Sequence, residues 1–284
     1  MKGRDSLELS WFKSLMYGLF SGLLDIFPVS AQAHSALLLK FFGLKASSDV
    51  LNLLIHLAVL AALYYSSQNH LVRMNRARAL ARIPKRKRKR PLDVRSMMDW
   101  SLLKTMMIPA LIGVYLRKYT ASISTNLMLI ALFLFLNGVI LYMPQFFPTS
   151  NRDSRTLSRV EGLLMGLGGA ASAVPGISAI GTSTAIASLC GVDRLYGLDM
   201  ALMMNMAISA GLAFLDILAI AANGLGALSF MILVRYILSA AAAFGGCLLG
   251  IKLMRHLAAE RGYSLFGVYC WGLALFTFIL NLIA

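Results

Sequence analysis

Residues 18–35 read GLFSGLLDIFPVSAQAHS, and this stretch combines two properties that rarely occur together. It is apolar enough to lie in a membrane, yet it contains an acid, Asp25, a proline, Pro28, and a histidine, His34. Ionisable side chains in hydrocarbon are costly unless they line a cavity or have partners, so they mark functional sites by default. A continuous spanning helix would expose them to lipid. The pattern therefore predicts a re-entrant helix–break–helix over about 12–44, with its irregular backbone covered by protein.

A second stretch of the same character, VPGISAIGTST, lies at residues 174–184. It belongs to an apolar, glycine-rich segment at about 160–190, which we also expect to be broken. The pattern Ser-Ala-(three residues)-Ser occurs in both stretches, at 30–35 and at 178–183, with a proline shortly before it each time. We therefore expect one scaffold to bring the two polar stretches together.

The composition is that of an integral membrane protein. Of the 284 residues, 58% are hydrophobic and 14% are charged, whereas a soluble domain carries about a quarter charged residues. The apolar runs reach the roughly 20 residues that a helix needs to cross a bilayer. We predict an all-α integral membrane protein, with residues 1–284 as a single membrane domain and residues 1–12 as an interfacial segment. The expected spans are about 49–67, 101–117, 126–144, 197–221, 229–251 and 264–284.

The net charge of +15 is concentrated in one place. Eleven of the 27 Lys and Arg residues fall between Arg73 and Arg95, and they include the run KRKRKR at 85–90. In a membrane protein such a cluster is typical of a cytoplasmic loop, expected here at 68–100, that faces anionic lipid head groups. This distribution argues against a nucleic-acid-binding protein. Binding of RNA or of a protein by the loop is the alternative.

Placing the 68–100 loop in the cytoplasm fixes a topology. The loops at 145–160 and 252–262 then also lie in the cytoplasm, and both are basic, as the positive-inside rule requires. The two broken segments open from opposite faces, and three spans follow each of them. This predicts an inverted repeat, with halves at about 12–144 and about 160–284. In transporter-type architectures of this kind the ligand site lies near the interface of the repeats.

At the two polar stretches the chain resembles the BacA-type undecaprenyl-pyrophosphate phosphatases. The first family motif, roughly G-x-x-E-G-x-x-E-x-x-P-[IV]-S-S-x-x-H, corresponds to GLFSGLLDIFPVSAQAH at 18–34. The second, P-G-x-S-R-S-G-x-[ST], corresponds to PGISAIGTS at 175–183. The resemblance covers essentially the whole chain in order. The departures from the two motifs, given in the order of the sequence, are Ser21 for the first glutamate, Asp25 for the second, Ala31 for a serine, Ala179 for the arginine and Ile180 for a serine.

The resemblance implies a membrane hydrolase that converts undecaprenyl pyrophosphate to the monophosphate, so that the lipid carrier is recycled for cell-wall synthesis. It further implies a multi-pass protein of the bacterial plasma (inner) membrane, with a polyprenyl (pyro)phosphate lipid as ligand, and it allows a homodimer. Asp25 and His34 are the expected acid and nucleophile or general acid/base, and Asp25 is also the expected ligand of a divalent cation, Mg or Ca. The full set of candidate residues is Asp25, His34 and Ser30 for catalysis, and Ser21, Ser178, Gly176, Thr182 and Ser183 for substrate binding.

The replaced residues leave the enzymatic activity open. Ser21 and Ala179 stand where the motifs have a glutamate and an arginine, and removing one preorganised donor from a reaction of this kind costs roughly 3–4 kcal/mol. Arg194 and Arg235 are the nearest replacements along the sequence. His56 lies one helical turn after Asn52, so we expect a packing histidine bonded to a neighbour such as Asn52, and a role in the site is the alternative. The alternatives are an impaired relative that binds or translocates a polyprenyl phosphate or another anionic lipid, and a membrane subunit whose basic loop recruits a partner.

Overall fold

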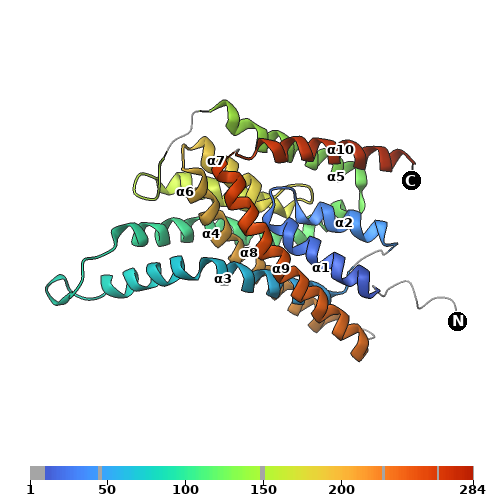
Figure 1. Ribbon diagram of the computed structural model, residues 1–284, viewed down its shortest axis with the longest axis horizontal. Coiled ribbons are helices and arrows are strands. Elements are labelled where there is room, and N and C mark those ends of the chain that lie inside the picture. Colours follow the sequence, from blue (N-terminus) through green and yellow to red (C-terminus); the bar gives the residue numbers. More distant parts are fainter. Residues whose placement is uncertain (1–9, 44–46, 148–150, 226–227, 261, 284) are drawn as a thin grey trace.

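A computed structural model describes five parts of the chain, residues 10–43, 47–147, 151–225, 228–260 and 262–283. Most of the interfacial segment predicted at 1–12 lies outside them. Within the described parts the regular structure is helical and no β-strand forms (Figure 1). The α-helices are α1 Trp11–Ile26, α2 Ala31–Phe41, α3 Asp49–Ala81, α4 Val94–Thr120, α5 Leu127–Tyr142, α6 Arg159–Ala170, α7 Ala179–Leu189, α8 Arg194–Asn223, α9 Phe230–Glu260 and α10 Ser264–Ile283.

Six helices in the described parts are long and apolar enough to cross a membrane, which confirms the predicted number of spans. They are α3, α4, α5, α8, α9 and α10, and the short 3₁₀ helices Ala121–Thr125 and Met143–Phe146 extend α4 and α5. Four shorter helices remain. These are α1 and α2, which replace the predicted segment at 12–44, and α6 and α7, which replace the one at 160–190.

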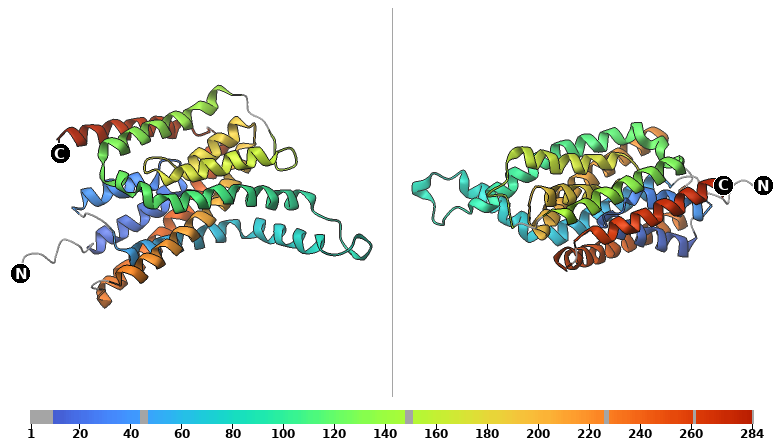
Figure 2. Two further views of the ribbon diagram at one scale, coloured as in Figure 1. Left: turned by 180° about the vertical axis from the view of Figure 1, so that it is seen from behind. Right: turned by 90° about the horizontal axis from the view of Figure 1, so that it is seen from above.

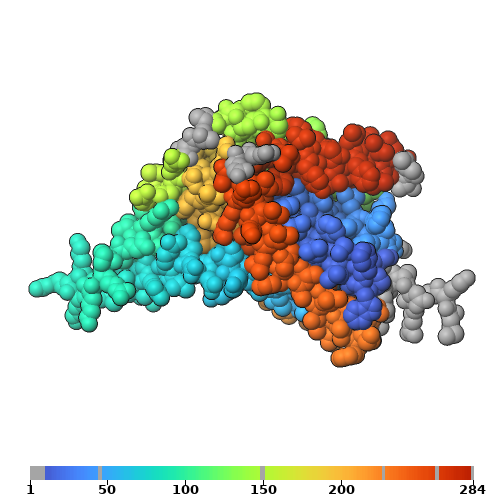
Figure 3. All heavy atoms as spheres, in the orientation of Figure 1, coloured from blue at the N-terminus to red at the C-terminus, as the bar shows by residue number. Residues whose placement is uncertain are grey.

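The prediction of a basic loop over 68–100 is wrong in its extent. Helix α3 continues to Ala81 and α4 already begins at Val94, so the connection is only residues 82–93. The basic segment stays helical because its inner face packs on α4: Met74 is fully buried, and the Arg78 guanidinium lies over the Trp100 ring at 4.2 Å from its centroid. The 33 residues of α3 span about 50 Å, against about 30 Å of hydrocarbon. The basic hairpin, residues 68–100, therefore projects beyond the bundle (Figure 1, Figure 3).

The two broken segments are helical hairpins whose ends lie close together. In the first, Lys13 Nζ near the start of α1 donates to the carbonyl oxygen of Phe42 after α2, at 3.1 Å. In the second, Arg152 before α6 pairs with Val192 after α7, and the Asp193 N–H donates to the Arg152 carbonyl at 3.0 Å. The second hairpin opens toward the basic hairpin and the first toward the opposite end of the molecule (Figure 1). This geometry suits two segments that enter a membrane from opposite faces, and their re-entrant placement stays a prediction.

The helix packing repeats between the two halves. Helix α1 packs on α9 as α6 packs on α4, and α3 packs on α9 as α8 packs on α4. Equivalent helices also meet each other: α3 packs on α8, and α5 on α10, which run side by side in Figure 2. Exchange of the two halves leaves this set of pairs unchanged, as an inverted repeat predicts.

Glycines allow the closest of these contacts. A Cβ atom added at Gly18 of α1 would lie 2.0 Å from the carbonyl oxygen of Ser239 in α9. A Cβ atom at Gly166 of α6 would lie 2.4 Å from the carbonyl oxygen of Met106 in α4. Small residues let membrane helices approach until their backbones touch. Close contact at a glycine therefore holds each short hairpin against a long helix, α1 against α9 and α6 against α4.

Candidate functional site

The breaks of the two hairpins meet in the interior. Ser30, at the break between α1 and α2, has a positive φ of 64°, which is strained for a residue other than glycine. Its Oγ accepts a hydrogen bond from the backbone N–H of Gly176, at the break before α7, at 3.0 Å. Gly176 has φ of 111° and packs so closely on Phe133 that a Cβ atom would lie 2.5 Å away. The two polar stretches predicted to come together are therefore in direct contact.

Asn137 in α5 ties the same two breaks together. Its Nδ2 donates to the carbonyl oxygen of Pro28 at 2.9 Å, and its Oδ1 accepts from the Ser178 N–H at 3.0 Å. The side chain is fully buried. Backbone groups in a break have no helical partner, and leaving them unpaired inside a membrane costs several kcal/mol each. Asn137 supplies one donor and one acceptor to the two breaks at once.

A cavity of about 420 Å³ lies beside the breaks. Residues from the start of α3, such as Asn52, and from the end of α4, such as Thr120, line it, so it lies away from the basic hairpin. The motif residues Ser21 and Asp25 also line it. A second, small cavity of about 20 Å³ adjoins it, because the two share the lining residues Asp25, Ala31, Gln32 and Arg117. We call this small cavity the extension, and Ser178 and Ala179 of the second motif also line it. Both motifs therefore contribute to one polar space.

Asp25 and Arg117 are the charged residues at the junction of cavity and extension, and both line the two spaces. Asp25 Oδ2 accepts a hydrogen bond from Asn205 Nδ2 in α8 at 2.7 Å, which fixes the carboxylate in orientation. Arg117 comes from the last turn of α4. Its Nε atom is buried and has no hydrogen-bond partner in the described structure. Among the described residues that line the cavity, Arg117 is the only Arg or Lys.

His56 also lines the cavity, and its expected role needs correction. The sequence predicted a packing histidine bonded to a neighbour such as Asn52, with a site role as the alternative. Instead, His56 Nδ1 lies 2.6 Å from Oδ2 of Asp216 in α8, while Asn52 Oδ1 accepts a hydrogen bond from Ser47 Oγ. A carboxylate on one ring nitrogen fixes the tautomer and leaves the other nitrogen for a ligand. The arrangement can therefore move a proton at His56 Nε2.

Other predicted site residues lie outside the described lining of the cavity. His34 Nδ1 bonds the Ser30 carbonyl at 2.8 Å, and Nε2 lies 2.8 Å from the Tyr269 hydroxyl of α10, with the two rings stacked. Thr182 and Ser183 are buried within α7. The eight predicted residues thus divide in two. Ser21, Asp25 and Ser178 line the cavity or its extension, whereas the described linings of both do not include Ser30, His34, Gly176, Thr182 and Ser183.

The family model described as Bacitracin resistance protein BacA matches residues 14–276. This chain belongs to the BacA family. With six apolar helices of spanning length in its described parts, it is a multi-pass membrane protein. It is 25% identical over 272 residues to an undecaprenyl-diphosphatase of Methanobrevibacter smithii, covering 94% of this chain and 96% of that one. It is 24% identical over 284 residues to undecaprenyl-diphosphatase 1 of Shouchella clausii, covering 95% and 96%, and 26% identical over 271 residues to an undecaprenyl-diphosphatase of Thermomicrobium roseum, covering 91% and 93%.

Four polar residues of the site lie outside the BacA motifs and were not predicted from the sequence. Arg117 was read only as the end of a span, and Arg194 and Arg235 were considered in its place. Asn205 and Asp216 each stand within an apolar run of α8, as Asn137 does in α5. Polar residues inside spans mark functional or structural sites by default, so this signal was available. It identifies such residues without showing which of them face the same space.

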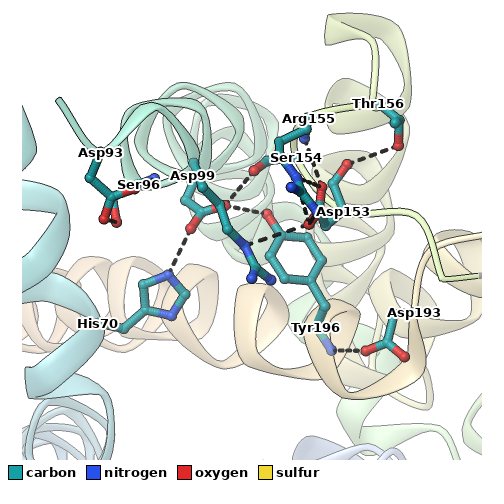
Figure 4. A network of polar contacts seen from close by, with 11 residues as sticks. His70, Asp93, Ser96, Asp99, Asp153, Ser154, Arg155, Thr156, Asp193 and Tyr196 are labelled. Carbon is teal, nitrogen blue, oxygen red and sulfur yellow. Dashed lines mark hydrogen bonds and ion pairs between the residues drawn. The ribbon is translucent and has the colours of Figure 1, made fainter. Parts of the chain in front are cut away.

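A second polar network lies at the opposite end, next to the basic hairpin (Figure 4). Asp99 of α4 is 2% exposed and accepts from His70 Nε2 of α3 at 3.0 Å and from the Tyr196 hydroxyl of α8 at 2.7 Å. A third donor is the Ser154 hydroxyl, in the segment before α6. Beside it, hydrogen bonds from the Arg155 side chain hold the pKa of the Asp153 carboxyl below its usual range. The network joins α3, α4, α8 and the 151–158 segment on the hairpin side.

Proposed function

We propose that this BacA-family protein is an undecaprenyl-pyrophosphate phosphatase-like hydrolase, which cleaves a polyprenyl pyrophosphate to the monophosphate and inorganic phosphate. The names of its relatives support this reaction, since the similarity extends over nearly the whole chain. The observation that carries the proposal is the shared polar space. Ser21 and Asp25 of one motif and Ser178 of the other line one cavity and its extension, although about 150 residues of sequence separate the motifs.

The side chains in this space suit hydrolysis of a phosphoric anhydride. Water must attack the terminal phosphorus, the anhydride bond must break, and the charge on the phosphoryl oxygens must be stabilised. Asp25, held by Asn205, is placed to orient the attacking water. The Ser21 hydroxyl is buried without a hydrogen-bond partner in the described structure, so it is a donor for a phosphoryl oxygen. The Ser178 hydroxyl instead caps α7 and donates to the Phe27 carbonyl at 3.4 Å. His56, held by Asp216, is placed to accept or donate the proton, a role that imidazole serves near neutral pH.

We assign His34 a positioning role, in contrast to the nucleophile or acid/base that the family motif implies. Both its ring nitrogens are engaged, one with the Ser30 carbonyl and one with Tyr269. This holds the start of α2 against α10 and keeps the strained backbone of Ser30 in place. On this proposal, replacing His34 reduces turnover because the backbone at the break between α1 and α2 loses its conformation.

A divalent cation, Mg or Ca, is part of the proposal, and Asp25 is the residue that would hold it. Among the described residues, no group of three or more His, Cys, Asp or Glu could hold a metal ion. Mg²⁺ commonly binds through one or two carboxylates together with substrate phosphates. One carboxylate in the cavity therefore fits a cation that arrives with the pyrophosphate and neutralises charge on its oxygens.

The remaining parts of the proposal concern the surroundings. We place the protein in the bacterial plasma (inner) membrane with the basic hairpin in the cytoplasm, where its cations nearest the bilayer, such as Arg73 and Arg76, meet anionic lipid head groups. The cavity then opens toward the outer face. A homodimer stays a prediction, which the mass of the purified protein in detergent tests.

The test is release of inorganic phosphate from undecaprenyl pyrophosphate by the purified protein, with and without EDTA. We expect release that EDTA suppresses and that Asp25→Asn reduces at least a hundredfold. The matched control is Asp49→Asn, a change at the start of α3 outside the described cavity lining. Folded wild-type protein that binds the lipid without releasing phosphate would refute the hydrolase and leave a lipid-binding relative.

A further inference from the structure

The guanidinium of Arg117 is placed like the cation of an anion-binding site. It borders both the cavity and its extension, and its buried Nε has no hydrogen-bond partner in the described structure. Its charge interacts with the carboxylates of Asp25 and Asp216, which offsets part of the cost of burying it. Among the described residues, the side-chain hydrogen bonds of these two carboxylates come from Asn205 and His56, and none comes from Arg117. The N–H donors of Arg117 are therefore available to a ligand.

We propose that Arg117 binds the pyrophosphate, as the cation that the BacA motif carries at position 179. Ala179 lines the same extension as Arg117, so the motif position and Arg117 border one space. Ala179 starts α7, whereas Arg117 reaches the space from α4. The planar fork of an arginine can contact two phosphate oxygens at once, which an ammonium group cannot do.

The side chains around Arg117 are consistent with an arginine on α4 that replaces the motif arginine at position 179. Ala31 and Ala179 are small, and both line the extension into which Arg117 faces. The motif has a serine and an arginine at these two places. Their reduction to alanine leaves room for a guanidinium that enters from α4. Ser178 lines the same extension, where its hydroxyl caps α7 by accepting the Gly181 N–H.

The inference rests on the proposed function for the reaction, while pyrophosphate binding can be measured without turnover. The probe is undecaprenyl pyrophosphate added to the purified protein in detergent, with EDTA present, and binding is followed by calorimetry. Phosphate release is measured separately. The variants are Arg117→Ala, Arg117→Lys, and the double variant in which Arg117→Ala is combined with Ala179→Arg.

We expect Arg117→Ala to weaken binding at least tenfold and to lower turnover roughly 10²–10³-fold, the range for losing one preorganised donor. Arg117→Lys should recover part of the binding. The double variant should recover more, because it restores a guanidinium at the motif position 179. The matched control is Lys118→Ala, since Lys118 is exposed and bonds Tyr115 at the surface. It should leave binding and turnover unchanged.

Two outcomes separate the inference from the proposed function. Unchanged binding in folded Arg117→Ala would overturn the role of Arg117, whatever the wild-type turnover. Wild-type protein that releases no phosphate, yet binds the lipid through Arg117, would refute the hydrolase and retain the anion site. If Arg117→Ala melts well below the wild type, the role of Arg117 is tested with Arg117→Lys instead. A folded Arg117→Lys variant that binds like the wild type would overturn the requirement for a planar fork, and one that binds more weakly supports it.

Discussion

Replacing Asn137 by alanine tests whether one side chain holds the two breaks together. The change removes the donor to the Pro28 carbonyl and the acceptor for the Ser178 N–H, and both groups lie in the interior. Leaving one buried polar group unpaired costs about 1–3 kcal/mol, so two cost about 2–6 kcal/mol. For a chain of this size 1 kcal/mol corresponds to roughly 2–4 °C in melting temperature. We therefore expect a decrease of at least about 4 °C.

The assay is thermal melting of the purified protein in one detergent, followed by tryptophan fluorescence. Asn281→Ala is the matched control, because Asn281 is exposed on α10. Asn137→Ala should also lower phosphate release at temperatures where it remains folded, since Ser178 lines the extension of the cavity. If Asn137→Ala melts at the same temperature as the wild type, the breaks are held in some other way and the reasoning is wrong.

Asp99→Ala should destabilise the protein by about 3–5 kcal/mol, because it leaves two buried donors, Ser154 and Tyr196, and the half-buried His70 without their carboxylate. The change Asp93→Ala at an exposed helix cap should cost about 1 kcal/mol, and melting in detergent compares the two variants. Gly18→Ala should push α1 away from α9 and lower expression and melting temperature, whereas Gly245→Ala, whose added Cβ meets open space, should be neutral. Equal melting temperatures for the two variants would contradict the close packing of α1 on α9. His56→Gln should lower turnover roughly 10²–10⁴-fold with little change in lipid binding, and a matching loss of binding would argue for a structural role instead.

Much of the fold follows from local properties of the chain. Apolar runs of bilayer length give the six spans, and the polar residues within 18–35 and 174–184 mark the two breaks. Helix ends were less accurate. The stretch from residue 68 to Ala81 was expected to be a loop because it is charged, but a charged helix that packs one apolar face on α4 is stable. Hydropathy measures burial in lipid and therefore does not show where such a helix ends.

The sequence by itself determined the membrane class, the family motifs and three residues of the cavity, Ser21, Asp25 and Ser178. Only the tertiary structure placed Arg117 beside Asp25 and joined His56 to Asp216, pairs that are separated by 92 and 160 residues. Which faces of two helices meet depends on their tilt, rotation and depth in the bundle, and these are set by packing across the whole molecule. A motif fixes the local backbone, whereas the arrangement of charges in the cavity arises from the contacts among α1, α3, α4 and α8.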